Sequence, residues 1–159
     1  MRLSFFSFLI IFAFFASCSK SSSSSCPANT GIPDTTEISN LRNFIATNAL
    51  DATFDSRGFY YKILGPGYGA RFPTLASTVT VSYRGSLTNG TVFDSTETGA
   101  TRPFVLGNLI LGWQYGIPLV KKDGVVDLYL PPSLGYGCNG SGKIPGNSIL
   151  IFRIILKDY

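Results

Sequence analysis

Residues 78–95 read TVTVSYRGSLTNGTVFDS, and this stretch decides the fold class. Small polar and larger side chains alternate over residues 78–84, which is typical of a β-strand with one face toward a core. The tetrapeptide Thr88-Asn89-Gly90-Thr91 then contains the Asn-Gly pair that is favoured in tight hairpin turns. Residues 92–94 begin the next strand, so the stretch predicts a β-hairpin.

The sequence on either side of this hairpin alternates between short apolar runs and turns. Residues 59–64, 125–130 and 148–156 are runs of strand length and strand composition. Residues 109–120 are also apolar, but glycine and proline lie near their ends, and they predict one short helix of about two turns. This order predicts an antiparallel α+β domain whose sheet wraps a single helix.

A further helix is predicted on the N-terminal side of the strands. Glu37 follows Asp34 at the spacing of a helix N-terminus. Apolar side chains then recur at helical spacing at Ile38, Leu41, Phe44 and Ile45. We expect a helix over about residues 35–48, within a segment of helix and linker that covers residues 34–58. Its apolar stripe is expected to dock on the domain, and a dimer face is the alternative.

The first 17 residues have the pattern of a secretory signal peptide. Met1-Arg2 precedes a 14-residue run that is almost entirely apolar, shorter than the roughly 20 residues of a membrane-spanning helix. The run ends in Phe15-Ala16-Ser17-Cys18, which resembles a bacterial lipobox and implies cleavage before Cys18 and lipid attachment to it. Ordinary secretion or a retained anchor is the alternative. Residues 18–33 are rich in serine and predict a flexible tether.

Two cysteines remain besides the predicted lipid attachment site. Cys26 follows the serine-rich run and Cys138 lies in a glycine-rich stretch. In an oxidising cell envelope two such cysteines often pair, and this pair would fix the tether to the domain. The alternative is two unpaired cysteines that lie too far apart to meet.

The composition removes several classes of function from the leading hypotheses. The sequence contains no histidine, which disfavours Ser-His-Asp and Cys-His nucleophiles and histidine-ligated zinc. No paired-carboxylate motif is apparent among the nine acidic residues. The net charge of +4 is scattered along the chain, so a nucleic-acid partner is not predicted. Any catalysis must therefore depend on shape, burial and a few dipoles.

Five fragments of the sequence, taken in order, resemble the FKBP family of peptidyl-prolyl isomerases. They are VSYRG at 81–85, NGTVFDS at 89–95, FVLG with ILGW at 104–107 and 110–113, LGYG at 134–137, and IPGNS with LIF at 144–148 and 150–152. The resemblance implies a domain over residues 59–159. It also implies a twisted antiparallel half-barrel of five to six strands around a helix at about residues 110–117, with the binding pocket between helix and sheet.

Carried over residue by residue, the resemblance implies the members of this pocket. They are Tyr83, Phe93, Asp94, Leu109, Ile110, Trp113, Tyr136, Ile144 and Phe152. Tyr83, Asp94, Trp113 and Tyr136 are the implied catalytic residues, and the other five are implied to bind substrate. Phe104 is left open between pocket wall and core.

Each of these residues has an implied role. Trp113 would be the floor under a proline ring, and aromatic walls would surround it at Tyr83, Phe93 and Phe152. The Ile110 N–H and the Tyr136 hydroxyl would hold substrate carbonyls. Asp94 would lie at the pocket edge beside Tyr83 and polarise the local field.

Isomerisation of an X-Pro bond suits a chain without histidine. The amide rotates over a barrier of roughly 18–20 kcal/mol without any covalent bond being broken, so no nucleophile, metal or cofactor is implied. The twisted amide is less polar than the planar one, and a dry aromatic pocket favours it.

These observations predict an isomerase that acts on exported proteins and is anchored by lipid in the bacterial cell envelope. The expected partners are proline-containing polypeptides, the membrane through the anchor and, by resemblance, macrolide-type inhibitors; a monomer is expected. One alternative is a catalytically weak peptide-binding or chaperone module of the same fold. Another is a structural lipoprotein whose helix at residues 35–48 binds a partner.

Overall fold

The structure is a computed structural model that describes Cys26 and residues 29–159. The predicted signal peptide, the lipid attachment site at Cys18 and most of the predicted tether lie outside the described residues. Within the described part of the chain, no helix combines the length and the apolar character needed to cross a membrane.

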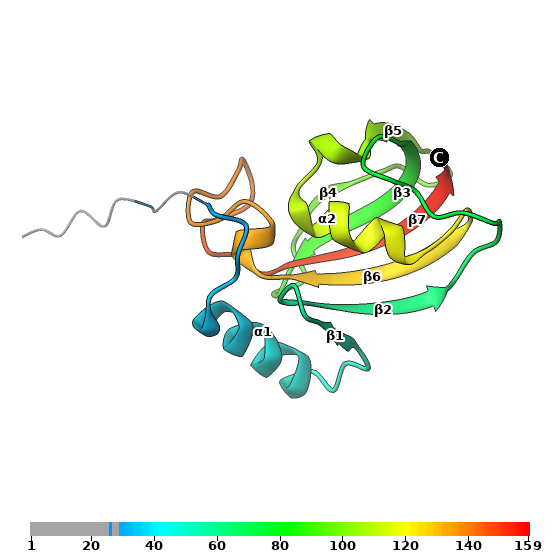
Figure 1. The fold of residues 1–159 in the computed structure, drawn as a ribbon. Coiled ribbons are helices and arrows are strands. Elements are labelled where there is room, and N and C mark those ends of the chain that lie inside the picture. Colours follow the sequence, from blue (N-terminus) through cyan, green and yellow to red (C-terminus); the bar gives the residue numbers. More distant parts are fainter. Residues whose placement is uncertain (1–25, 27–28) are drawn as a thin grey trace, which may run out of the picture.

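A single antiparallel sheet of seven strands forms the body of the protein (Figure 1). Its order is β1-β2-β6-β7-β3-β4, and β5 pairs with another part of β3. The strands are β1 (Thr53–Asp55), β2 (Phe59–Gly65), β3 (Thr78–Leu87), β4 (Val92–Ser95), β5 (Arg102–Val105), β6 (Gly124–Leu130) and β7 (Leu150–Asp158). The predicted antiparallel α+β architecture is confirmed.

The predicted hairpin joins β3 to β4. The Leu87 N–H donates to the Thr91 carbonyl over 2.9 Å, which closes the turn at Asn89-Gly90. Along β3 the buried side chains Val79, Val81 and Tyr83 alternate with less buried ones, as the pattern predicted. The alternation directs Tyr83 into the concave side of the sheet.

Helix α2 (Leu111–Gly116) lies against the concave face of the sheet (Figure 1). A Cβ atom on Gly112 or Gly116 would overlap the side chains of Leu130 and Leu128 on β6, so only glycine permits this close approach. A short 3-10 helix (Ile117–Leu119) continues from α2. The predicted short helix is therefore present, and it carries Trp113 into the core.

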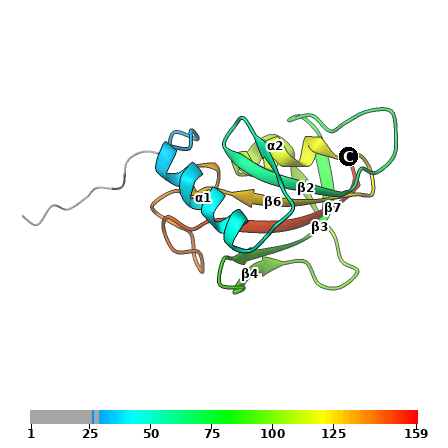
Figure 2. The ribbon, with the colours of Figure 1, turned by 90° about the horizontal axis from the view of Figure 1, so that it is seen from below.

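Helix α1 (Thr35–Thr47) lies on the opposite face of the sheet (Figure 2). The Asp34 side chain accepts a hydrogen bond from the Glu37 N–H and so caps the helix. Leu41 and Ile45 are buried against Tyr60 of β2 and Tyr129 of β6. The apolar stripe of α1 is thus docked on its own domain, as expected.

Two strands were not predicted. β1 lies inside the segment that was assigned to helix and linker, and it extends the sheet to Thr53 through its pairing with β2. β5 contains Pro103, which has no backbone N–H to donate. Because β5 lies off the main path of the sheet and pairs with β3, this missing donor is tolerated there, as at other sheet edges. These short strands raise the number to seven, above the five to six expected.

Candidate functional site

A cavity of about 340 Å³ opens between α2 and the concave face of the sheet. It is lined by Tyr83, Phe93, Asp94, Phe104, Leu109, Ile110, Trp113, Tyr136, Ser141, Lys143, Ile144 and Phe152. These side chains come from strands β3, β4, β5 and β7, from α2 and the residues before it, and from the loop between β6 and β7.

Trp113 is the centre of an aromatic cluster in this cavity. Its ring meets Tyr83 at a centroid distance of 5.0 Å and Phe152 at 5.2 Å, and the planes are nearly perpendicular in both pairs. Phe104 approaches Trp113 from another side at 6.1 Å, and Phe93 packs on Phe152 at 5.4 Å. Edge-to-face packing holds these stiff rings in place, so the cavity has a preformed apolar floor and walls.

A polar network lies at the edge of the aromatic cluster. The Tyr83 hydroxyl donates to Asp94 Oδ2 over 2.5 Å, and Arg102 Nη1 donates to the Tyr83 oxygen over 3.2 Å. Arg102 also lies 3.5 Å from Asp94 Oδ1. Burial, reinforced by the bond to Asp94, raises the pKa of Tyr83 to about 12. Tyr83 therefore remains a neutral donor at physiological pH, and the Asp94 carboxylate is held by two partners.

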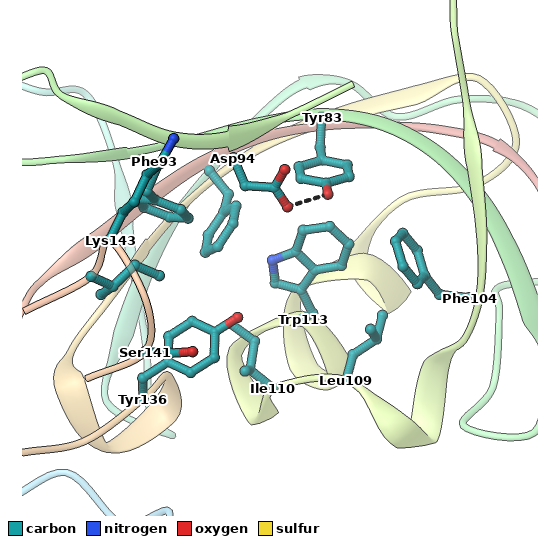
Figure 3. A pocket seen from close by; sticks show the side chains of 12 residues that line it. Tyr83, Phe93, Asp94, Phe104, Leu109, Ile110, Trp113, Tyr136, Ser141 and Lys143 are labelled. Atoms are coloured by element: carbon teal, nitrogen blue, oxygen red, sulfur yellow. Dashed lines mark hydrogen bonds between the residues drawn. The ribbon is translucent and has the colours of Figure 1, made fainter. Parts of the chain in front are cut away.

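Several other hydrogen-bond donors of the cavity have no partner within the described part of the chain. They include Trp113 Nε1, which is buried, the Ile110 backbone N–H and the Tyr136 hydroxyl. Figure 3 shows the Tyr136 hydroxyl directed into the cavity, on the side opposite Tyr83 and Asp94. A buried donor without a partner costs about 1–3 kcal/mol, and a ligand that supplied an acceptor to such a donor would recover this energy.

The loop between β6 and β7 closes one side of the cavity. Tyr136, Ser141 and Lys143 of this loop lie at one wall of the cavity (Figure 3). Ile144 of the same loop also lines the cavity. Burial raises the pKa of the Tyr136 hydroxyl above its usual value, so this group also remains protonated and able to donate.

The structure brings all nine residues of the implied pocket around one cavity. Their roles in binding and catalysis stay predictions. Phe104, which the sequence left open, is a wall of the cavity and is only partly buried. Sequence reasoning missed Arg102, Ser141 and Lys143 because each lies in a segment outside the recognised fragments.

Cys26 and Cys138 form a disulfide in the structure, with their Cα atoms 5.7 Å apart. This distance lies within the range that a disulfide requires. Of the two alternatives that the sequence left open, the structure has the paired one. The bond attaches the segment before α1 to the loop that carries Tyr136.

Comparison with known proteins agrees with this geometry. Residues 69–157 match the family described as FKBP-type peptidyl-prolyl cis-trans isomerase, which is more than half of the chain. The chain is 47% identical over 104 residues to "FKBP-type peptidyl-prolyl cis-trans isomerase FkpA" of Buchnera aphidicola subsp. Schizaphis graminum, covering 65% of this chain and 41% of that protein. It is 43% identical over 103 residues to "Peptidyl-prolyl cis-trans isomerase Mip" of Coxiella burnetii, covering 64% and 44%.

Solved structures give the same result. The crystal structure of FkpA from Escherichia coli matches with a TM-score of 0.70 and 33% identity, over 77% of this chain and 59% of that one. The crystal structure of AtFKBP13 matches with a TM-score of 0.63 and 30% identity, over 68% and 98%.

The fold and the cavity define an FKBP-like domain. The chain belongs to the FKBP-type peptidyl-prolyl cis-trans isomerase family. It spans less than half the length of the two curated relatives named above.

Proposed function

We propose that this protein is a peptidyl-prolyl cis/trans isomerase that binds the proline of its substrate on Trp113. The observation that carries the proposal is the preformed aromatic cavity, whose donors include several without a partner among the described residues. A proline ring is apolar and compact, and Trp113, only 5% exposed, offers it a dry floor. Membership of the family supports the same activity.

Catalysis would come from preferential binding of the twisted amide. Rotation about the X-Pro bond reduces conjugation and makes the carbonyl less polar, so transfer into an apolar cavity favours the twisted form over the planar form. The Ile110 N–H and the Tyr136 hydroxyl would donate hydrogen bonds to the peptide carbonyls on either side and fix the backbone. Asp94, held by Tyr83 and Arg102, would present a fixed dipole beside the rotating bond.

The substrates would be proline-containing polypeptides in the bacterial cell envelope. Family membership supports the substrate class, and the apolar leader with its lipobox-like Cys18 supports export and lipid anchoring. The Cys26–Cys138 disulfide supports an oxidising compartment, because structural disulfides are rare where thiols are kept reduced. The same cavity is the site where macrolide-type inhibitors would compete with the peptide.

The proposal is tested by isomerisation rates of several X-Pro peptides with the full chain purified in detergent. We expect acceleration that falls sharply in a Trp113→Ala/Asp94→Ala double variant. The matched control is Phe72→Ala/Asp51→Ala, which removes an exposed aromatic ring and an exposed carboxylate outside the cavity. Protein that is folded and binds the peptides without accelerating any of them would favour the catalytically weak binding module.

A further inference from the structure

We infer that Cys26 and residues 29–37 are part of the binding apparatus, because they position the loop that carries Tyr136. The inference rests on the proposed function for the role of Tyr136 toward substrate. We call the contacts of Cys26, Asn29 and Glu37 with this loop the N-terminal clamp.

The Tyr136 loop needs restraint from outside. Residues 135–146 contain five glycines, two of them directly beside Tyr136, and glycine leaves the backbone with the most freedom. The hydroxyl of Tyr136 has no protein partner in the described part of the chain, so its own side chain does not fix its position. Hydrogen bonds such as Gly137 N–H to Pro132 O tie the loop only to itself.

The first contact of the clamp comes from α1. The Glu37 carboxylate accepts hydrogen bonds from the Ser133 N–H over 3.2 Å and from the Ser133 hydroxyl over 2.5 Å. Ser133 lies in the 3-10 helix Pro132–Leu134, which leads directly into the Tyr136 loop. Glu37 therefore fixes the start of the loop to a helix that is itself docked on the sheet.

The other two contacts lie on either side of Tyr136. Asn29 Nδ2 donates to the Gly135 carbonyl over 3.4 Å, and a Cβ atom on Gly137 would lie 3.3 Å from the same nitrogen. Beyond them Cys138 is joined to Cys26 by the disulfide. Contacts at Ser133, Gly135, Gly137 and Cys138 thus bracket Tyr136 from both directions along the chain.

The same segment also touches the element that carries the other proposed carbonyl-binding donor. The backbone at Gly31 lies against the Leu111 side chain so closely that a Cβ atom there would overlap it. Leu111 begins α2 directly after Ile110. Cys26 and residues 29–37 therefore contact both α2 and the Tyr136 loop, and we expect these contacts to set the distance between the Ile110 N–H and the Tyr136 hydroxyl.

Release of the clamp should weaken peptide binding mainly through Tyr136, because the contacts of the clamp lie on either side of this residue. A side chain that must be immobilised on binding loses affinity by about 2- to 10-fold relative to one that is already held. One clamp contact is a disulfide, so reduction should have the same effect as a Cys26→Ser/Cys138→Ser variant.

The test is a double-mutant cycle on the full chain in detergent, with the dissociation constant of an Ala-Phe-Pro-Phe peptide as the readout. We expect Cys26→Ser/Cys138→Ser to weaken binding by about 2- to 10-fold when Tyr136 is present, and by less than about 2-fold in a Tyr136→Phe background. An equal loss in both backgrounds, or no loss with Tyr136 present, would overturn the inference.

Glu37 gives an independent arm of the same test. Glu37→Ala should weaken binding as the cysteine variant does, and Glu37→Gln, which keeps an acceptor for the Ser133 N–H, should restore most of the affinity. Asp51→Ala is the matched control, because this carboxylate is 92% exposed and, among the described residues, its ion pair is with Lys62. An equal loss in the alanine and glutamine variants would contradict the hydrogen-bond role of Glu37.

Two further readouts separate this inference from the proposed function. A wild-type protein that binds the peptide without accelerating isomerisation would defeat the proposed function, while the affinity cycle would still report on the clamp. Amide hydrogen exchange over residues 134–140 requires no peptide: faster exchange in the clamp variants supports the inference, and unchanged exchange overturns it.

Discussion

The Tyr83 hydroxyl donates a hydrogen bond of 2.5 Å to Asp94 Oδ2, and this bond joins β3 to β4 at the edge of the aromatic cavity. Arg102, from β5, contacts both residues. The three strands that meet at the end of the sheet thereby hold one carboxylate in a fixed orientation toward the space where a proline peptide would lie.

An Asp94→Asn variant tests the charge in this network. The amide keeps the shape of the side chain but removes the charge, so the hydrogen bond from Tyr83 becomes a neutral one and the ion pair with Arg102 is lost. We expect kcat/KM for a proline peptide to fall by about 10-fold. Asp51→Asn is the control, and an unchanged kcat/KM in Asp94→Asn would show that the carboxylate charge has no part in catalysis.

The raised pKa of Tyr83 predicts a loss of stability in alkali. Its folded-state pKa of about 12 exceeds the ordinary value of 10.0, so folding favours the protonated form. The resulting stabilisation is complete below pH 10 and is lost as the pH rises through 12.

This prediction is measured as the free energy of unfolding in urea across that pH window. The difference between the wild type and a Tyr83→Phe variant should shrink between pH 10 and 12, because phenylalanine has no ionisable group. Subtracting the variant removes the contribution of the other tyrosines, and a constant difference would mean that Tyr83 is not held as a neutral donor.

Trp113 is expected to support both stability and binding. Trp113→Ala removes a buried indole and should lower the free energy of unfolding by about 3–5 kcal/mol. Trp113→Phe keeps an aromatic floor but removes Nε1–H, so it should cost less stability and still weaken peptide binding. Phe72→Ala, at a ring that is 50% exposed, should stay within about 0.5 kcal/mol of the wild type. Denaturant unfolding and peptide titration measure the two effects.

The docking of α1 makes a separate prediction about stability. Leu41 is fully buried between α1 and the sheet, so Leu41→Ala should lower the free energy of unfolding by about 2–5 kcal/mol. The neighbouring exposed Arg42 serves as the control in Arg42→Ala. A variant that changes the oligomeric state but not the stability would instead point to a dimer face.

The sequence predicted the parts of the fold that have strong local patterns. The alternation in β3, the Asn-Gly turn and the helical spacing of α1 each follow from a local preference of the chain. β1 and β5 were missed because strands of three and four residues are too short to show a period, and their pairing depends on β2 and β3.

The residues of the site could be predicted where they lie in the five fragments that resemble the FKBP family. All nine implied residues line the cavity. Ser141 and Lys143 also line it, and Arg102 contacts Tyr83 and Asp94 at its edge, but these three residues reach the site through tertiary placement alone. The contact of Glu37 with Ser133 joins residues 96 positions apart, and the spacing of Glu37 after Asp34 suggested only a local cap. Long-range contacts of this kind carry no signal in one sequence.

The central claim is most directly tested by magnetisation exchange between the cis and trans signals of a proline peptide, measured by NMR at a catalytic concentration of the full chain in detergent. Uncatalysed exchange takes roughly 10–100 s. This is too slow to give an exchange signal before the magnetisation relaxes. We expect exchange that increases with protein concentration and is lost in the Trp113→Ala/Asp94→Ala variant. Binding of the peptide to folded wild-type protein with no increase in exchange would contradict the claim.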